Sequence, residues 1–347
     1  MDKLTISPDV TIREAMKILD DVKAKCIPVV DVEGKLVGTL AYSDLQKSIF
    51  AGTAFNSTIE QSYNRKPIYL VEGQFTEKQK QELIVKKSIV PIICESGLFL
   101  RYVSWSDDFA SNSKRKNKRL ENQVIIMAGG RGSRLEPFTK VLPKPLIPIH
   151  DKTVIEHIIE RFLVCGVNEF SITVNYKSSI IKAYFEDVQH DYSIQFIEEN
   201  EPLGTAGSLK LLSSSIDQPF IVTNCDIIIE SDYIDFYDFH QKYCYDISII
   251  ASLKEYIIPY GTCELNSAGH LKYINEKPEY HFLINTGMYI LNPHVLGLIP
   301  ENKKYDITDL IDDAKKEGMK VGVYPISESA YIDVGQWEEY KKAIEQL

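Results

Sequence analysis

The sequence predicts an α/β fold with a mostly parallel mixed sheet in its C-terminal two thirds, preceded by a smaller α+β module. Two observations lead to this fold class. In the C-terminal part, short apolar runs typical of buried strands alternate with segments of helical periodicity. In the N-terminal part, the string IPVV at residues 27–30 recurs as VPII at residues 90–93, an offset of 63 residues. This recurrence indicates an internal repeat, whose two units need each other to bury their sheets.

The clearest change of composition is the polar segment SNSKRKNKRLE at residues 111–121. We therefore expect an N-terminal module at residues 1–109, a linker at 110–121 and a second domain at 122–347. A short basic run is also compatible with nuclear targeting or RNA binding, but it is more often a solvated hinge.

The composition excludes several classes of protein. A net charge of −10 argues against a general nucleic-acid binder, whose affinity depends on neutralising phosphates with Lys and Arg. No apolar run approaches the length that spans a bilayer, and the N-terminus lacks a signal-peptide core. The six cysteines and seven histidines are scattered, without the close pairs of a zinc site. We expect a cytoplasmic protein with reduced thiols and no membrane partner.

The elements expected in each part follow from these patterns. Ligands of α/β sheets bind beyond the carboxyl ends of the parallel strands, so residues that follow a strand are candidates for function. Helices are expected in the repeat at residues 12–19 and 77–86. In the second domain, strands are expected at residues 124–127, 171–175, 193–197, 220–223, 247–253 and 282–290, and helices at 154–165, 180–185 and 208–212.

The most informative string follows the first of these strands. Gly129, Gly130 and Gly132 let the backbone approach a ligand closely, because no Cβ stands in the way. Two cations come next, Arg134 and then Lys144, which lies between two prolines that restrict its backbone. A buried strand, exposed backbone N–H groups and fixed cations together predict a cradle for a polyphosphate.

This string resembles the signature of the sugar-1-phosphate nucleotidyltransferases, L-x-G-G-x-G-[ST]-R-L-x-P-x-T-x-x-x-P-K-P-x-x-P. Met127 and Ala128 precede the glycines, Ser133 takes the [ST] position, and the other fixed positions are met through Pro148. The resemblance extends over about residues 122–347 and implies a Rossmann-like nucleotidyltransferase domain. It also implies that Arg134 and Lys144 are catalytic and hold the triphosphate. By the same resemblance, the nucleotide lies against Ala128, Gly129, Gly130, Gly132 and Ser133.

A second resemblance of this kind concerns a metal. The expected strand at 220–223 is followed by Asn224-Cys225-Asp226, which resembles the family's N-x-D with Cys225 in place of the usual glycine. The family's second metal ligand corresponds to Asp333 in YIDVG. An aspartate at a strand end is often only a helix cap. Two carboxylates plus substrate phosphates suit Mg²⁺, so Asp226 and Asp333 are the expected magnesium ligands.

The string EPLGTAG at residues 201–207 resembles the family's base-binding loop. The resemblance implies contacts from Gly204 and Thr205. A carboxylate, Glu199 or Glu201, would accept from the N1–H and exocyclic amine of guanine, a donor pair that uracil and thymine lack. A solvated acidic turn explains these glutamates equally well.

Three short strings resemble the family's sugar-phosphate site. They are Tyr260-Gly261, Glu276-Lys277-Pro278 and Asn285-Thr286-Gly287. The resemblance implies that Gly261, Glu276 and Asn285 face the sugar. Lys277 would be catalytic and would hold the sugar phosphate.

The N-terminal repeat resembles a tandem pair of CBS domains, a Bateman module, through GKLVGTLAYSDL at residues 34–45. In that family a Thr or Ser followed three residues later by Asp often binds an adenine nucleotide. The first unit has Ala41 instead of the hydroxyl, whereas the second keeps Ser104 and Asp107 as a candidate regulatory site. A structural or dimerising module is an equal alternative, and CBS modules commonly associate, which favours a homodimer.

These resemblances imply a Mg²⁺-dependent transfer of a nucleotidyl group from a nucleoside triphosphate to a sugar 1-phosphate, with release of pyrophosphate. The LGTAG string favours GTP. A CBS pair ahead of the transferase resembles the glucosamine-1-phosphate guanylyltransferases of legionaminic acid synthesis, which favours glucosamine 1-phosphate. Mannose or heptose 1-phosphate, and UTP or CTP, remain open. The alternative class is a nucleotide-sensing regulatory protein with an inactive transferase domain.

Overall fold

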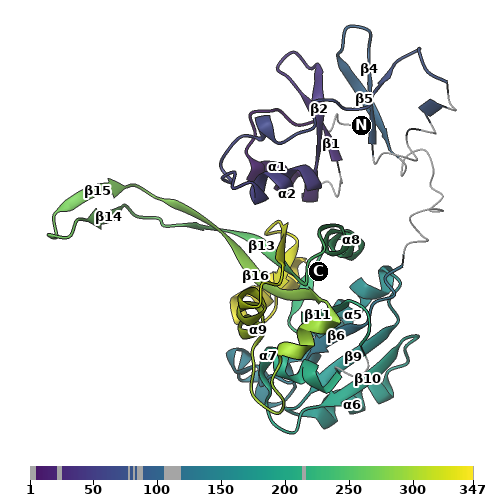
Figure 1. The fold of residues 1–347 in the computed structure, drawn as a ribbon, viewed down its shortest axis with the longest axis vertical. Helices are drawn as coiled ribbons and strands as arrows, with labels where there is room; N and C mark the ends of the chain where they lie inside the picture. The colour runs from purple at the N-terminus through teal and green to yellow at the C-terminus, as the bar shows by residue number, and fades with distance from the viewer. Residues whose placement is uncertain are drawn as a thin grey trace. The chain divides into compact units, whose positions relative to one another are not determined.

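The computed structural model describes residues 5–21, 26–76, 79–80, 83, 89–104, 119–212 and 216–346. It divides into two compact units (Figure 1). Most of the expected linker at 110–121 and most of the expected helix at 77–86 lie outside the described residues. The first unit comprises Met1–Asn117, Glu255–His281 and Ser327–Ser329; the second comprises Lys118–Lys254, Phe282–Ile326 and Ala330–Leu347.

The first unit contains the expected repeat. Cys26 and Ile89, the first residues of β1 and β4, are 63 residues apart, and each hairpin has its register irregularity at the equivalent position. The expected helix at 12–19 is confirmed as α1. The elements are α1 (Ile12–Asp21), β1 (Cys26–Val30), β2 (Leu36–Ala41), α2 (Tyr42–Phe50), the 3₁₀ turn η1 (Ile59–Gln61), β3 (Leu70–Val71), β4 (Ile89–Ile93) and β5 (Phe99–Ser104).

The two repeats are joined by a reciprocal pair of hydrogen bonds. The N–H of Leu36 donates to the carbonyl of Gly97 at 3.1 Å, and the N–H of Phe99 donates to the carbonyl of Gly34 at 2.9 Å. Both glycines have left-handed backbones, with φ of 79° and 86°. Each donor and acceptor of one repeat has its counterpart 63 residues away, so the hairpins are related by an approximate two-fold.

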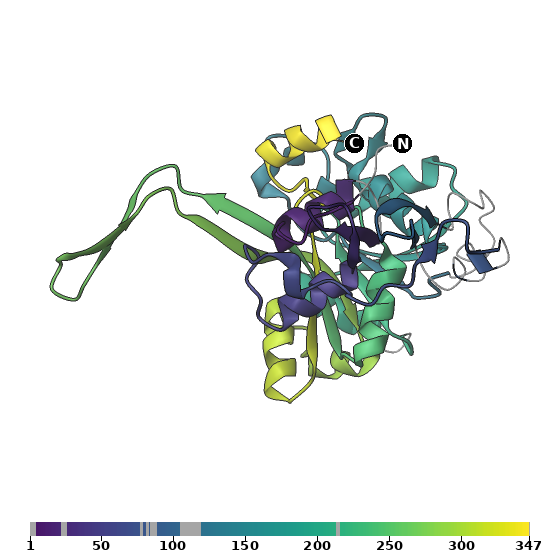
Figure 2. The same cartoon turned by 90° about the horizontal axis from the view of Figure 1, so that it is seen from above.

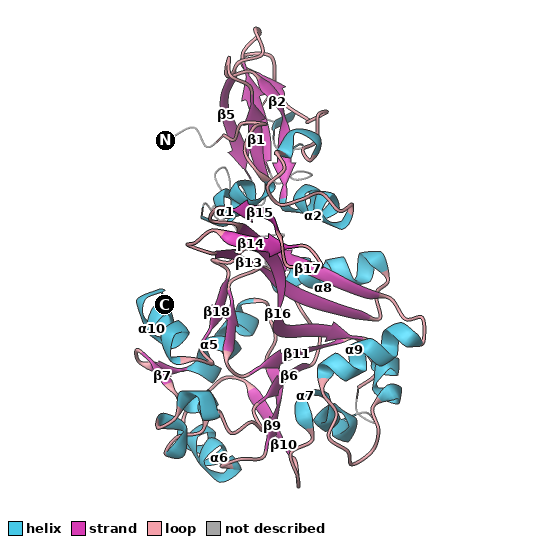
Figure 3. Cartoon of the chain, turned by 90° about the vertical axis from the view of Figure 1, so that its left-hand side faces the viewer, coloured by secondary structure: helices cyan, strands magenta, loops and turns pink. Residues whose placement is uncertain are grey.

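The second unit is built on a seven-stranded sheet of order β10-β9-β6-β11-β16-β13-β17 (Figure 3). The first four strands are parallel, β16 runs antiparallel to β11, and β13 is parallel to β17. The expected mostly parallel mixed sheet is therefore confirmed. The strands are β6 (Val124–Met127), β9 (Glu169–Val174), β10 (Ser193–Glu198), β11 (Phe220–Asn224), β13 (Ile247–Ile257), β16 (Glu279–Leu291) and β17 (Val321–Ile326).

Helices cover both faces of this sheet. In β6, Val124 and Ile126 pack into one apolar core, while Ile125 and Met127 pack into another, as the alternation of a strand requires. The expected helix at 208–212 is a 3₁₀ turn, and α8, α9 and α10 were not expected from the sequence. The helices are α5 (Val154–Val164), α6 (Ser178–Asp187), α7 (Gly204–Gly207), η5 (Ser208–Leu212), α8 (Tyr233–Tyr243), η6 (Pro293–Leu298), α9 (Ile307–Lys316) and α10 (Trp337–Gln346).

Smaller elements complete the chain. The signature string forms three 3₁₀ turns, and the hairpin β14–β15 continues the chain between β13 and β16 (Figure 2). Within the described residues, no helix is both long and apolar enough to cross a membrane. The small elements are η2 (Ser133–Leu135), η3 (Phe138–Lys140), η4 (Lys144–Leu146), β7 (Pro148–Ile149), β8 (Lys152–Thr153), β12 (Ile227–Ile229), β14 (Thr262–Leu265), β15 (Leu271–Asn275) and β18 (Tyr331–Asp333).

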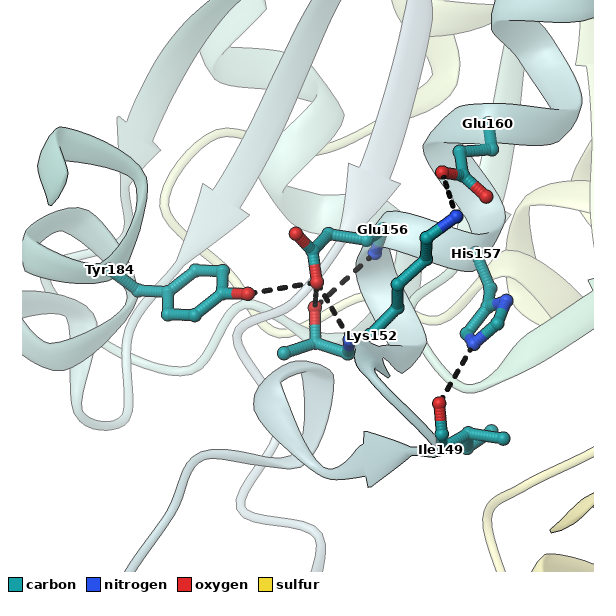
Figure 4. Close-up of polar contacts among 7 residues, drawn as sticks. Ile149, Lys152, Glu156, His157, Glu160 and Tyr184 are labelled. Carbon is teal, nitrogen blue, oxygen red and sulfur yellow. Dashed lines mark hydrogen bonds and ion pairs between the residues drawn. The ribbon is translucent and has the colours of Figure 1, made fainter. Parts of the chain in front are cut away.

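A capping box starts α5 directly after the signature string (Figure 4). The carboxylate of Glu156 accepts from the N–H and hydroxyl of Thr153 at 2.7 and 2.8 Å, and from the hydroxyl of Tyr184 at 2.8 Å. Burial pushes the pKa of Glu156 upward, but these hydrogen bonds outweigh it and hold the pKa below its usual range. His157 Nε2 lies 3.2 Å from the carbonyl oxygen of Ile149, and this contact links α5 to the end of the signature string.

Replacing Thr153 by Ala removes this cap and should lower the free energy of unfolding by about 1 kcal/mol. Urea denaturation at pH 7 measures the change. A Thr153→Ser variant, which keeps the hydroxyl, should stay close to wild type.

The carboxylate of Glu156 gives a pH-dependent contribution to stability. Because the pKa of Glu156 is lowered by folding, this contribution is present above its unfolded pKa and is lost as the pH falls through its folded pKa. The difference in the free energy of unfolding between wild type and Glu156→Gln should therefore shrink in acid.

Candidate active site

The carboxyl end of β6 is the point where the order of the sheet reverses. From β6 the chain passes to β9 and β10 on one side and then returns to β11 on the other. Open α/β sheets bind ligands at such a switch point. The glycine-rich loop leaves β6 here, and Asp226 follows the end of β11, so the topology brings both to the same edge of the sheet.

Close packing explains two glycines of the loop. A Cβ on Gly129 would lie 2.7 Å from Oε1 of Glu199. A Cβ on Gly132, which has a φ of 66°, would lie 2.9 Å from the methyl of Thr139 and 3.0 Å from Cβ of Lys144. These glycines therefore let the loop lie directly on the groups beneath it. The position at Gly130 is open.

The other predicted residues of the loop differ in exposure. Ala128 is buried, and its N–H donates to the carbonyl of Thr173 at 2.9 Å, which continues the sheet. Ser133 and Arg134 are exposed in η2, where they are accessible to a ligand.

Lys144 forms an ion pair with Asp226. The side chains of the two residues are only 16% and 19% exposed, so water screens the pair weakly. Pro143 has a φ of −64° and Pro145 follows Lys144, which restricts the backbone on both sides of the ammonium group.

Strand pairing brings Asp333 to Asp226. Residue Ile227 of β12 is paired with Asp333 of β18, and the N–H of Val334 donates to the carbonyl of Asp226 at 2.9 Å. The N–H of Gly335 donates to Oδ1 of Asp333 at 2.7 Å. A two-stranded ribbon thus places two carboxylates that are distant in the sequence side by side.

One point in space is close to all three charged groups. A Cβ on Gly335 would lie 2.7 Å from Oδ2 of Asp226, 2.8 Å from Oδ1 of Asp333 and 3.0 Å from Nζ of Lys144. Glycine is therefore the residue that leaves this small space open. The structure brings the predicted residues Lys144, Asp226 and Asp333 together, and we call these three the charged triad.

The surroundings of Asp333 disfavour the charged form of its carboxyl group. Burial raises the pKa of Asp333 above its usual range; the N–H of Gly335 opposes this, Asp226 reinforces it, and Lys144 opposes it. The described residues contain no group of three or more His, Cys, Asp or Glu that could hold a metal ion. A metal at the triad would take two carboxylates from the chain and its remaining oxygens from a ligand, which is a donor set that suits Mg²⁺.

The two glutamates of the expected base loop lie in different surroundings. Glu199 is 8% exposed, and its Oε2 accepts from the N–H of Leu203 at 3.1 Å. Burial raises its pKa, although the hydrogen bonds from Leu203, Thr173 and Ser208 oppose the shift. Glu201 is exposed. The two glutamates therefore do not form a single solvated turn, because Glu199 is buried and only Glu201 is exposed.

The structure reveals a second function of the LGTAG string, which the sequence analysis missed. Thr205 Oγ1 accepts from the N–H of Ile307 at 2.9 Å, and Asp306 Oδ1 accepts from the N–H of Thr205 at 3.0 Å. Gly204 and Gly207 pack closely on the same segment, and the N–H of Gly207 donates to the carbonyl of Tyr305. The string thus anchors the start of α9. The capping sequence from Asp306 onward was the available signal.

The expected sugar-site residues fall into both units. In the first unit, a Cβ on Gly261 would lie 2.7 Å from Oε2 of Glu276, so these two residues are neighbours, and Lys277 has a left-handed φ of 46°. In the second unit, Asn285 Nδ2 donates to the hydroxyl of Tyr289 at 2.7 Å.

The candidate regulatory site is not described. The side chain of Ser104 and all of Asp107 lie outside the described residues. In the first repeat, Asp44 accepts from the N–H of Ala41 at 3.0 Å and pairs with Lys47, so this carboxylate caps α2.

A glycine-rich loop and a charged triad at the switch point of an open α/β sheet are typical of a phosphate-binding protein. Residues 123–347 match the nucleotidyl transferase family, and residues 1–51 match the CBS domain. The chain therefore belongs to the nucleotidyl transferase family and carries a CBS domain at its N-terminal end.

Individual relatives are similar over the same region. Mannose-1-phosphate guanyltransferases of Candida albicans and Schizosaccharomyces pombe are 32% and 33% identical over 230 and 228 residues, which is 62% and 63% of this chain. The chain spans 62% of the length of each of these two relatives. The crystal structure of HddC from Yersinia pseudotuberculosis has a TM-score of 0.52 and 30% identity, over 65% of this chain and 99% of HddC. HddC has also been solved in complex with GMP-PN.

Replacing Asp333 by Asn should stabilise the metal-free protein at pH 7. Because the pKa of Asp333 is raised by folding, the folded protein binds this proton more tightly than the unfolded chain. Stability is therefore lost as the pH rises from the unfolded pKa through the folded pKa, and Asn avoids this loss. Urea denaturation in EDTA at pH 7 measures the gain, which should diminish toward pH 4. The exposed Asp217→Asn is the control; equal behaviour of the two variants would contradict the assignment.

Proposed function

We propose that the chain transfers a nucleotidyl group from a nucleoside triphosphate to a sugar 1-phosphate, giving an NDP-sugar and pyrophosphate. The observation that carries this proposal is the charged triad beside the glycine-rich loop, with three groups within 3.0 Å of one point. Family membership supports it, and so do the names of the relatives, which are mannose-1-phosphate guanyltransferases.

The reaction needs alignment and charge stabilisation more than proton transfer. An oxygen of the sugar phosphate attacks the α-phosphorus in line, the bond to the bridging oxygen breaks, and pyrophosphate leaves. Lys144 and Arg134 hold the triphosphate, and Lys277 holds the attacking phosphate. No covalent protein intermediate forms. No general base is required, because a sugar phosphate is already largely dianionic near neutral pH.

Asp226 and Asp333 would hold Mg²⁺, which supplies positive charge to the phosphate oxygens when it is bound. The ammonium of Lys144, which pairs with Asp226, supports this assignment, because two partly buried carboxylates attract positive charge. Lys144 also serves the triphosphate, so it belongs to both the metal and the nucleotide parts of the site.

GTP is the nucleotide that we propose. The names of the relatives and the GMP-PN complex of HddC support it. Of the two glutamates, Glu199 is the better candidate to recognise guanine, because its carboxylate lies next to Gly129 of the glycine-rich loop. Glu201, which is exposed, would act at the rim of the site. UTP and CTP are the alternatives.

Glucosamine 1-phosphate is the sugar that we propose, on the resemblance of the CBS–transferase arrangement to the enzymes of legionaminic acid synthesis. The relatives favour mannose 1-phosphate, which is the leading alternative, followed by heptose 1-phosphate. Gly261, Glu276 and Asn285 would contact the sugar. Adjacency of Gly261 and Glu276 supports a shared role for these two.

The CBS module would regulate or dimerise the enzyme. An adenine nucleotide at Ser104 and Asp107 would change the kinetics of transfer, whereas a purely dimerising module would leave them unchanged. Titration with AMP, ADP and ATP, together with sedimentation of the full chain, separates a nucleotide sensor from a homodimerisation module. The alternative to an enzyme is a nucleotide-sensing regulatory protein whose transferase domain is inactive.

Pyrophosphate release with Mg²⁺ tests the proposal, with four nucleoside triphosphates crossed against glucosamine, mannose, glucose and N-acetylglucosamine 1-phosphates. We expect the fastest release with GTP and glucosamine 1-phosphate. Release with another pair would keep the reaction and replace the nucleotide or the sugar. If no pair of substrates reacts in either direction, the proposal of a regulatory protein replaces that of an enzyme.

Gly335→Ala should reduce transfer by about 100-fold while leaving the fold intact. Its Cβ would displace the ends of the Asp226, Asp333 and Lys144 side chains, and misplacement of such groups by about 1 Å costs on the order of 100-fold in rate. The apparent Mg²⁺ requirement should rise as well, as measured by initial rates over a Mg²⁺ series. Gly297→Ala is the matched control, because its Cβ position is open. Wild-type rates in Gly335→Ala would show that the triad is not the site.

A further inference from the structure

Lys177 follows the carboxyl end of β9 and precedes α6. It is the N-cap of α6 and has a left-handed backbone, with a φ of 55°. A lysine in this region is uncommon and costs on the order of 1 kcal/mol relative to an ordinary conformation. Glycine or asparagine would adopt this backbone more easily, so the reason for a lysine here lies in its side chain.

The ammonium group of Lys177 caps the signature string. It donates to the carbonyl oxygens of Thr139, Lys140 and Val141 at 3.3, 2.7 and 2.9 Å. An ammonium has three donors and no acceptor, so these carbonyls satisfy it completely. A positive charge at the end of the turn η3 also interacts favourably with carbonyls that lack a helical partner.

The capped carbonyls lie close to the charged triad along the chain. Val141 precedes Lys144 by three residues, and Thr139 packs with Lys144 against the position where Gly132 lacks a Cβ. Thr139 is 2% exposed, and its hydroxyl has no hydrogen-bond partner among the described residues. Its backbone is therefore fixed by packing and by Lys177. A displacement of residues 139–141 would move both the glycine-rich loop and Lys144.

The segment that follows β9 also contacts the base loop. Asn175 donates from Nδ2 to the carbonyl of Glu199 at 2.6 Å. Asn175 and Lys177 thus connect the end of β9 to two loops that come from different parts of the sequence.

We propose that Lys177 is a positioning residue that fixes the signature string so that Lys144 meets the triphosphate, and this inference rests on the proposed function. The three donors of the Lys177 ammonium are all used by carbonyl groups of the protein, so we assign Lys177 no contact with the substrate. Removal of the Lys177 side chain should therefore reduce kcat and weaken the binding of the nucleoside triphosphate, while the KM for the sugar phosphate stays constant.

The test compares Lys177→Met, Lys177→Arg and Lys177→Gly with Lys182→Met in the full chain. Lys182 lies on the same helix and pairs with Glu198, so it is the matched control. We expect kcat to fall by about 10- to 100-fold in Lys177→Met. Lys177→Arg should recover most of the loss, because the guanidinium also donates to carbonyls. Ethylammonium should rescue Lys177→Gly but not Lys177→Met.

Hydrogen exchange gives a readout that does not need substrate. The amides of Lys140, Val141 and Leu142 donate within the turn at 3.0, 2.9 and 2.9 Å. They should exchange at least 10-fold faster in Lys177→Met and at the wild-type rate in Lys182→Met. Lys177→Gly relieves the left-handed backbone, so a loss of activity in this variant reports on the side chain even if Lys177→Met is unstable.

Two failures are distinguishable. If wild type transfers nucleotide but Lys177→Met and Lys177→Gly keep kcat within twofold and unchanged exchange, the positioning role is overturned. If wild type is inert with every substrate pair, the proposed function fails, whereas faster exchange in Lys177→Met still supports the cap on the signature string.

Discussion

The second unit is constrained by one electrostatic arrangement, in which two partly buried carboxylates, Asp226 and Asp333, lie close together beside the ammonium of Lys144. Burial raises the pKa of Asp333, the charge of Asp226 raises it further, and the ammonium of Lys144 opposes the shift. Each member comes from a different part of the chain: the signature string, the end of β11 and the ribbon strand β18. The fold can be understood as the means of bringing these three segments together at the switch point of the sheet.

Local patterns in the sequence predicted much of this fold. The first expected strand of the second domain matches the structure at both ends, and the repeat offset of 63 residues also relates the registers of the two hairpins in the structure. Helices α8 to α10 were missed. In α8, aromatic residues occur on both the buried and the exposed sides, so the apolar periodicity is weak. The segment 208–212 has helical spacing, but it is a 3₁₀ turn of five residues.

The candidate site was less predictable from local patterns. Periodicity contains no information on which distant strands pair, so the meeting of Asp226 with Asp333 followed only from resemblance to a family. The anchoring of Thr205 on Asp306 was missed for the same reason, since the two residues are a hundred positions apart. Glycines gave a partial signal: Gly129, Gly132 and Gly335 each mark a close approach, although the sequence alone does not say what approaches.

The pairing of β12 with β18 also has a consequence for synthesis on the ribosome. Asp226 and its strand emerge about a hundred residues before Asp333. Until residues 331–335 are available, β12 has no partner strand, and the ammonium of Lys144 has one carboxylate of the triad instead of two. A nascent chain can therefore complete the parallel strands β6, β9, β10 and β11 while the charged triad is still incomplete. Assembly of the charged triad becomes a late step of folding, separate in time from formation of the sheet that carries it.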